Sequence, residues 1–224
     1  MKAGQPLSKE YTDQDVELVK KGVCNLVKHV ENARKFGVNV VVAVNKFKTD
    51  TPEEVEIVKE AALGAGAFAA VMSNHWAEGG AGAADLARAV QAACEAADES
   101  NFKFLYDLDL PIKEKIAIIC REIYGADGVD YSDIAETQIA QYEKSGFDKF
   151  PICMAKTQYS FSCDPAAKGV PTGFRVNVRE IRSCAGAQFL YPIAGDIMTI
   201  PGLPTRPGFF DVDLDEDGKV VGLF

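Results

Sequence analysis

The stretch Val38-Asn39-Val40-Val41-Val42-Ala43-Val44 is apolar and β-branched almost throughout. Such a run is typical of a strand buried on both faces, as in a parallel sheet. A second apolar run at 67–72 predicts another strand of the same kind. Patterns of three- and four-residue spacing predict helices before, between and after these runs, at 16–36, 51–63 and 83–97. The order helix, strand, helix, strand, helix predicts an α/β fold with parallel strands and right-handed crossovers.

The helix at 51–63 has the clearest start signal in the chain. Thr51 precedes Pro52, and Glu54 lies three residues after Thr51. A threonine cap with proline at the first helical position and glutamate at the third is a capping box. This signal fixes where the loop after the first strand ends.

A second region begins where the composition changes at 98–101. Beyond that point the sequence predicts two helices, three strands and a hairpin around Asp217-Gly218. The helices are expected at 112–124 and 134–145, and the strands at 151–156, 174–181 and 189–193. We therefore expect two domains: an α/β segment at 1–98, with a partial parallel sheet and flanking helices, and a smaller α+β domain at 99–224.

Composition excludes several classes of protein. The chain has 224 residues, with 24 Lys and Arg against 33 Asp and Glu, and a formal net charge of −9. An acidic protein of this kind is not expected to bind nucleic acid or anionic membranes. No apolar run approaches the roughly 18–20 residues of a membrane span, and the first residues do not form a signal peptide.

The cysteines and histidines do not predict a metal site. Six cysteines without a C-x-x-C pair, and two histidines far apart in sequence, favour free thiols in a reducing compartment. Cys24 and Cys94 fall in helical patterns and are expected to be buried. The aspartates at 213, 215 and 217 imitate a calcium loop, but Phe224 occupies the position that requires glutamate, so calcium binding is rejected.

Two aromatic residues follow the two predicted strands. Phe47 lies after the first strand and Trp76 after the second. Loops at the carboxyl ends of parallel strands share one edge, which is where open α/β sheets bind ligands. Two aromatic faces there suit a flat heterocycle. The alternative is that both rings are ordinary core residues.

A glycine-rich stretch follows Trp76. Gly79-Gly80-Ala81-Gly82 precedes the helix at 83–97, and its backbone amides could hold an anion. The alternative is a turn that lets the chain enter the helix. The sequence contains neither G-x-x-x-x-G-K-[ST] nor G-x-G-x-x-G, so neither common phosphate-binding motif is present.

Several longer segments, in order along the chain, resemble the formate–tetrahydrofolate ligase family, also called 10-formyltetrahydrofolate synthetase. They extend over nearly the whole chain from about residue 16. The segments are VVAVNKFKTDT at 41–51, NHWAEGG at 74–80, IYGAD at 123–127, CMAKTQYSFS at 153–162, PGLPTRP at 201–207 and the terminal GLF at 222–224.

The resemblance implies an enzyme of one-carbon metabolism. The family joins formate to tetrahydrofolate with ATP through formyl phosphate, and its large domain is P-loop-NTPase-like. The chain corresponds to the carboxyl-terminal portion, because the family's phosphate-binding loop lies upstream of the matching segments. ATP and Mg²⁺ thus belong to the complete enzyme, whose phosphate site is not in this chain.

The resemblance also implies a role for the two aromatic residues. Phe47 and Trp76 match the aromatics that sandwich the folate ring. Asn45, Lys46, Lys48, Gly79 and Gly80 would form the pocket edge, although some relatives carry proline where Lys48 stands. Lys156, Tyr159 and Arg206 lie in family-like segments, but no catalytic role is carried over to them.

Two hypotheses follow about how the chain acts. The first is that it supplies the folate-ring side of the ligase and works with an amino-terminal ligase half, in an oligomer, in the cytoplasm or an organellar matrix. The second is that it is an inactive fragment reused as a structural or interaction subunit.

Overall fold

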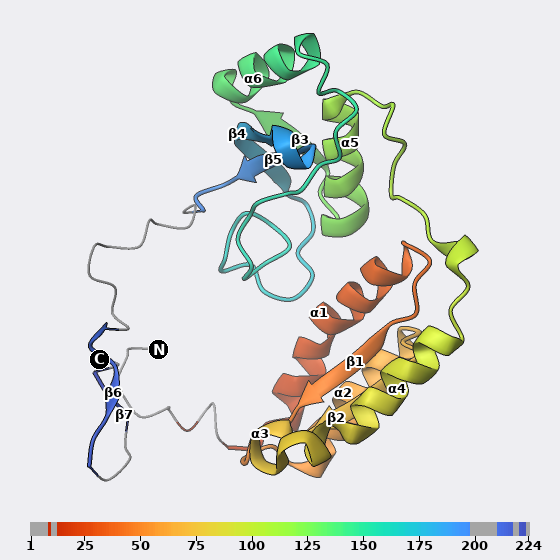
Figure 1. Cartoon of the computed structure of the whole chain (residues 1–224), viewed down its shortest axis with the longest axis vertical. Coiled ribbons are helices and arrows are strands. Elements are labelled where there is room, and N and C mark those ends of the chain that lie inside the picture. Colours follow the sequence, from red (N-terminus) through yellow and green to blue (C-terminus); the bar gives the residue numbers. More distant parts are fainter. Residues whose placement is uncertain (1–8, 10–12, 198–209, 217–219, 223–224) are drawn as a thin grey trace. The chain divides into compact units, whose positions relative to one another are not determined.

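The computed structural model describes residues 9, 13–197, 210–216 and 220–222 (Figure 1). Residues 14–197 form one compact unit, and the described part of 210–222 belongs to a second. The domain boundary predicted near residue 98 stays a prediction. Residues 14–197 nevertheless hold two separate hydrophobic cores, one built from residues 30–70 and one from residues 112–194.

The first core lies under a small parallel sheet. Strand β1 (Val41–Asn45) pairs with β2 (Ala69–Ser73), in register from Val41 opposite Ala69 to Asn45 opposite Ser73. The parallel pairing predicted from the sequence is confirmed. Buried Val30, Ala62, Ala67 and Ala70 form the core beside it.

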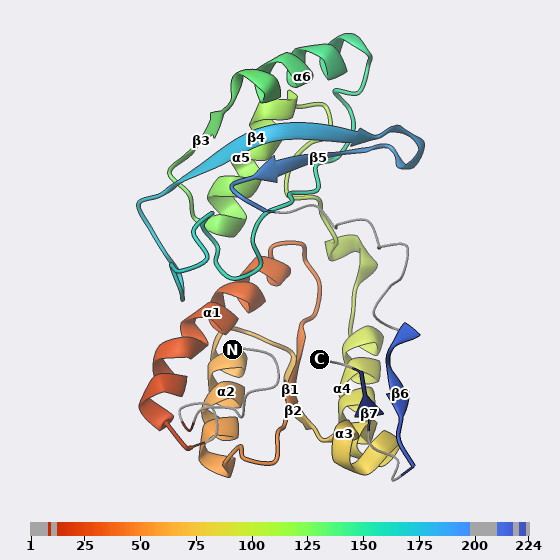
Figure 2. The ribbon, with the colours of Figure 1, turned by 90° about the vertical axis from the view of Figure 1, so that its left-hand side faces the viewer.

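Three helices flank this sheet: α1 (Val16–Arg34), α2 (Pro52–Gly64) and α4 (Ala84–Glu95). Helices α1 and α2 cover one face and α4 the other (Figures 1 and 2). The capping box of α2 is formed as predicted, with both reciprocal bonds between Thr51 and Glu54. A short helix α3 (His75–Glu78) and a 3-10 turn η2 (Gly79–Ala83) connect β2 to α4.

The second core lies in a mixed sheet of order β3-β4-β5. Strand β3 (Gly128–Tyr131) runs parallel to β4 (Arg175–Cys184), and β5 (Phe189–Ala194) runs antiparallel to it. Two helices contact this sheet. They are α5 (Ile112–Ile119), continued by the π-helical turn η4 (Cys120–Tyr124), and α6 (Asp133–Lys144).

Four short elements complete the set of helices and strands in the described structure. The 3-10 turns η3 (Glu99–Asn101) and η5 (Ala185–Ala187) lie in connections. In the second unit, β6 (Asp213–Leu214) pairs antiparallel with β7 (Val220–Val221), as the hairpin prediction requires. The predicted turn, Asp217-Gly218, lies outside the described residues, as do the segment 201–207 and Leu223-Phe224.

The predicted strand at 151–156 is wrong. This segment runs alongside β5 but makes only two isolated parallel bridges with it, Ile152 with Leu190 and Ala155 with Ile193. The backbone amides of Cys153 and Ala155 donate to β5 carbonyls at 2.8 Å. Between the two bridges the ladder would need an N–H from Pro192, which has none. The pairing is therefore interrupted at its centre.

Two expectations about burial are also wrong. The strands β1 and β2 are not buried on both faces: Ala43 and Met72 are exposed and most other positions are half-buried. The sheet holds only two strands in the described structure, so each strand has an open edge. Cys24 and Cys94 are exposed free thiols rather than buried ones.

Candidate functional site

The carboxyl edge of the β1–β2 sheet brings the two predicted aromatic residues into neighbouring loops. Asn45 and Ser73 form the last pair of the register. The following loops therefore leave from strands about 4.8 Å apart. The backbone N–H of Lys46 donates to Ser73 O at 3.0 Å, so the chains stay joined one residue past the strand.

Phe47 stands at the start of a tight turn. Its backbone N–H donates to Asp50 Oδ2 at 2.8 Å, and the Asp50 N–H donates back to Phe47 O at 3.2 Å. An aspartate closing a turn onto the backbone is a favourable local arrangement. The turn holds the backbone, while Phe47 remains 72% exposed.

Trp76 follows β2 as predicted, but it lies on the short helix α3 and not in an irregular loop. The segment is held at both ends. Ser73 Oγ lies 2.9 Å from His75 Nδ1, and the Asn74 N–H donates to Gly82 O at 3.0 Å. Gly82 is required here, because a Cβ would lie 2.5 Å from Asn74 O. The Trp76 ring is 89% exposed.

Neither Phe47 nor Trp76 is a core residue within this chain. Of the five predicted edge residues, Lys46 is half-buried, and the others are exposed: Asn45, Lys48, Gly79 and Gly80. Gly79 and Gly80 open the 3-10 turn η2, which enters α4 and matches the turn alternative for this stretch. The structure thus provides an exposed edge with two aromatic residues.

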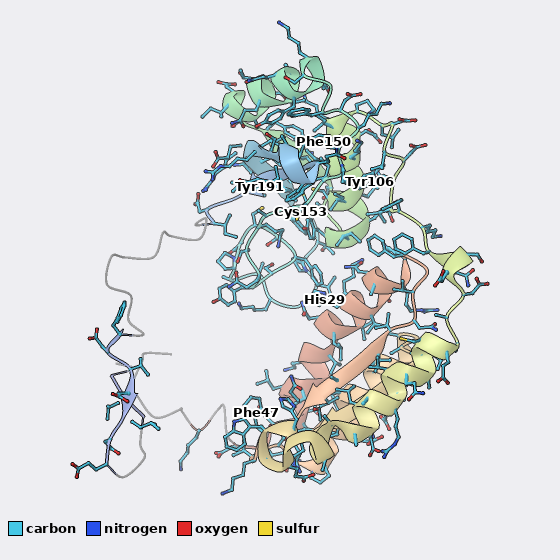
Figure 3. All side chains as sticks on the ribbon, viewed as in Figure 1. His29, Phe47, Tyr106, Phe150, Cys153 and Tyr191 are labelled. Carbon is cyan, nitrogen blue, oxygen red and sulfur yellow. The ribbon has the colours of Figure 1, made fainter. Side chains whose placement is uncertain are left out.

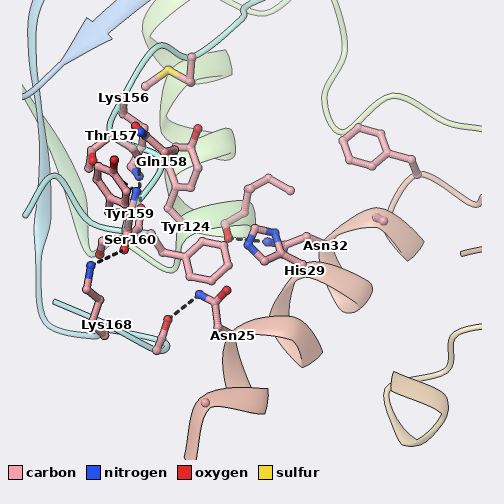
Figure 4. A pocket seen from close by; sticks show the side chains of 17 residues that line it. Asn25, His29, Asn32, Tyr124, Lys156, Thr157, Gln158, Tyr159, Ser160 and Lys168 are labelled. Carbon is pink, nitrogen blue, oxygen red and sulfur yellow. Dashed lines mark hydrogen bonds between the residues drawn. The ribbon is translucent and has the colours of Figure 1, made fainter. Parts of the chain in front are cut away.

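A pocket that the sequence did not predict lies between α1 and the segment 154–169 (Figure 4). Its volume is about 740 Å³. Asn25 Nδ2 donates to Gly169 O at 3.0 Å, and the His29 and Phe161 rings lie 4.7 Å apart. The only signal in the sequence was the family-like segment 153–162, which supplies one wall.

Lys156 belongs to that wall. Its ammonium donates to Thr157 O at 2.9 Å and to Ser160 O, and lies 5.0 Å from the centroid of the Tyr124 ring. Burial lowers the pKa of Lys156, and it raises the pKa of the Cys120 thiol to about 12 and that of the Tyr124 hydroxyl above its usual range. Cys120 and Tyr124 are thus neutral at physiological pH, and the thiol is unreactive.

Metal binding and membrane insertion have no support in the described residues. Within residues 9, 13–197, 210–216 and 220–222, no three His, Cys, Asp or Glu side chains gather as a metal site would require. No helix in these ranges is long and apolar enough to cross a bilayer.

Comparison with known proteins agrees with the resemblance. The sequence model of the family described as formate–tetrahydrofolate ligase matches residues 1–224. The chain belongs to the formate–tetrahydrofolate ligase family. The formate–tetrahydrofolate ligase of Spinacia oleracea is 53% identical over 222 residues, covering 99% of this chain and 34% of the spinach protein.

This chain matches a smaller share of two other relatives. The cytoplasmic C-1-tetrahydrofolate synthases of Schizosaccharomyces pombe and Homo sapiens are each 53% identical, over 98% and 99% of this chain. The chain spans 23% and 24% of their respective lengths. A mitochondrial form from S. pombe is 49% identical. The relatives thus occur in two compartments.

Proposed function

We propose that this chain contributes the folate-ring side of a formate–tetrahydrofolate ligase. The observation that carries the proposal is the pair of exposed aromatic side chains, Phe47 and Trp76, on loops that leave adjacent parallel strands. The pterin ring of tetrahydrofolate would lie between them. Asn45, Lys46, Lys48, Gly79 and Gly80 would border it, with polar groups for the edge of the ring.

The energetics favour a flat ligand at this edge. Both rings are left largely in water, and burying a phenylalanine side chain gains about 1.5–3 kcal/mol. Stacking against a planar ring adds about 0.5–1.5 kcal/mol for each aromatic pair. The turn at Asp50 and the bonds around Ser73 hold the two backbones before any ligand arrives. Preorganisation of this kind reduces the entropy lost on binding.

The chain does not supply the phosphate chemistry of the reaction. Phosphoryl transfer needs backbone amides, a cation and a metal ion around the phosphates. The sequence contains no phosphate-loop motif. We propose that ATP and Mg²⁺ are bound by the remaining part of the family's chain, and that the large domain is P-loop-NTPase-like only when that part is present.

A titration followed by tryptophan fluorescence tests the folate site. Trp76 is the only tryptophan, so its emission reports on this edge alone. Tetrahydrofolate should quench it, and Phe47→Ala should weaken binding by about 1 kcal/mol, roughly fivefold. Phe102→Ala removes another exposed aromatic side chain and should leave the affinity unchanged. A flat titration, or equal weakening by both substitutions, would contradict the proposal.

The second hypothesis, an inactive interaction subunit, has its own supporting observation. Val38, Phe68, Met72 and Val90 are exposed apolar side chains on or beside the two-stranded sheet. Such a surface suits a protein partner. The fluorescence titration separates the two hypotheses, because an interaction subunit without a folate site gives no quenching.

A further inference from the structure

The pocket beside α1 is separate from the proposed folate site. None of the 17 residues that line it belongs to the loops carrying Phe47 and Trp76. Figure 3 shows His29, at the pocket, well apart from Phe47. The walls of the pocket come from α1, from η4 and from the segment 154–169. Two hydrogen bonds join these walls: Asn25 donates to Gly169 O, and Asn32 Nδ2 donates to Ile123 O at 2.8 Å. The pocket is therefore preformed.

The charge of this pocket is opposite to that of the protein. Two lysines, Lys156 and Lys168, line it, and no aspartate or glutamate is among its 17 lining residues. The whole chain carries a formal charge of −9. A cavity lined by one sign of charge concentrates ligands of the other sign. The occupant is thus expected to be an anion.

Lys156 adds an independent observation. Its side chain is half-buried, and within the described residues no carboxylate lies at ion-pair distance from its ammonium. Lysines taken out of water are normally paired with an anion. Two of its three N–H groups already donate to Thr157 O and Ser160 O. One N–H remains, which suits a single carboxylate oxygen better than a phosphate that needs several donors.

The other walls favour a planar ligand with a hydrogen-bond donor. Phe36, Tyr124, Tyr159 and Phe161 supply aromatic surface. Asn32, which is 6% exposed, keeps its Oδ1 buried without a donor among the described residues. An acceptor left in this state costs about 1–3 kcal/mol. A ligand hydroxyl or ring N–H that reaches Oδ1, with Nδ2 still bonded to Ile123 O, would recover that free energy.

We propose that this pocket binds a planar aromatic carboxylate, with its carboxylate at Lys156 and its ring among the aromatic side chains of the walls. The site takes a ligand of small-molecule size, since pockets of roughly 300–1,000 Å³ are typical for such ligands. It is a second ligand site on the chain, and it stands independently of the proposed folate site.

The test uses 6-hydroxy-2-naphthoate and its neutral amide, with binding followed by ligand-observed NMR on the 224-residue chain. The acid should bind, and the amide should bind at least about tenfold more weakly, because only the acid satisfies Lys156. Lys156→Met should reduce the affinity for the acid to that of the amide. Lys144→Met, which removes an exposed lysine on α6, is the matched control and should change nothing.

A second variant keeps the test decisive if Lys156→Met does not fold. Gly22 lines the pocket from within α1, and a Cβ there meets no atom within 4 Å. Gly22→Leu should fold, because leucine is the better helix former, and should narrow the pocket and weaken binding of the acid. Its Trp76 quenching by tetrahydrofolate should be unchanged. Equal binding of acid and amide, or full binding by Gly22→Leu, would overturn the proposal.

Discussion

His29 shows how the environment of one residue sets a pH dependence. Its ring lies against Phe161, and burial lowers its pKa below the ordinary value. The unfolded chain therefore takes up the proton at a higher pH than the folded chain does. The contribution of His29 to the free energy of unfolding is fully present above the unfolded pKa of about 6.5. It is lost as the pH decreases toward the lower folded pKa.

We therefore expect the free energy of unfolding to fall as the pH decreases through and below the unfolded pKa of about 6.5. Replacing the ring, as in His29→Gln, should make this fall smaller. Urea denaturation at a series of pH values measures how steeply the free energy of unfolding depends on pH in the unchanged protein and in His29→Gln. Carboxylates with lowered pKa, such as Glu54, act at lower pH and do not obscure this window. Identical slopes for the two proteins would show that His29 is not the group responsible.

The sequence placed Phe47 and Trp76 at one sheet edge because strand order and parallel pairing follow from local patterns. It did not place Lys156, Tyr124 and His29 together. These residues come from three segments far apart in the chain, and no short-range pattern encodes their meeting. The burial of Cys24 and Cys94 was also mispredicted, because a helical pattern does not say which face a neighbour covers.

At the scale of elements, Glu54 joins two helix starts. Its carboxylate accepts from Thr51 N at 3.1 Å and Thr51 Oγ at 2.9 Å, and from Asp15 N at 2.9 Å. These bonds hold the pKa of Glu54 below its usual range. Glu54 thus links the start of α2 to the N-cap of α1. The turn that begins at Phe47 closes at Asp50, directly before Thr51.

Removal of the cap tests this arrangement. Thr51→Ala should lower the free energy of unfolding by about 1 kcal/mol, the usual loss for a helix N-cap. Thr49→Ala, at an exposed position two residues earlier, should change it by less than about 0.5 kcal/mol. Denaturant unfolding of both variants gives the comparison. Equal losses for the two variants would mean that the Thr51 cap does not stabilise the fold more than an exposed threonine does.

Element prediction succeeded where a start or stop signal was strong and failed where tertiary pairing decided. The helices α2, α5 and α6 carry caps or terminal glycines and appear close to their predicted bounds. Strand β3 has only four residues, Gly128–Tyr131, and was missed. The strand predicted at 151–156 failed because Pro192, forty residues away, interrupts its ladder.

At the scale of the whole molecule, the β1–β2 sheet has only two strands in the described structure. Two strands leave Ala43 and Met72 exposed, and the chain spans 23% of the S. pombe cytoplasmic synthase. In a parallel sheet, apolar strands of this kind have neighbouring strands at their edges and helices over both faces. We infer that the remaining part of the family's chain completes this sheet and carries the phosphate site.

Reconstitution tests that inference. The chain alone should form no 10-formyltetrahydrofolate from formate, ATP and tetrahydrofolate. Addition of a polypeptide that carries the rest of the family's sequence should restore turnover. Met72→Lys, which places a charge on the exposed sheet, should weaken the association, whereas Lys144→Met on α6 should not. Turnover by the isolated chain would refute the division of labour between the two parts.

The most direct test of the aromatic clamp is an NMR measurement of nuclear Overhauser effects between tetrahydrofolate and the protein. With the ligand at saturation, protons of the pterin ring should show contacts to the rings of both Phe47 and Trp76. The same contacts should be absent from the His29 and Tyr124 rings. Contacts to only one of the two clamp rings, or to neither, would contradict the account.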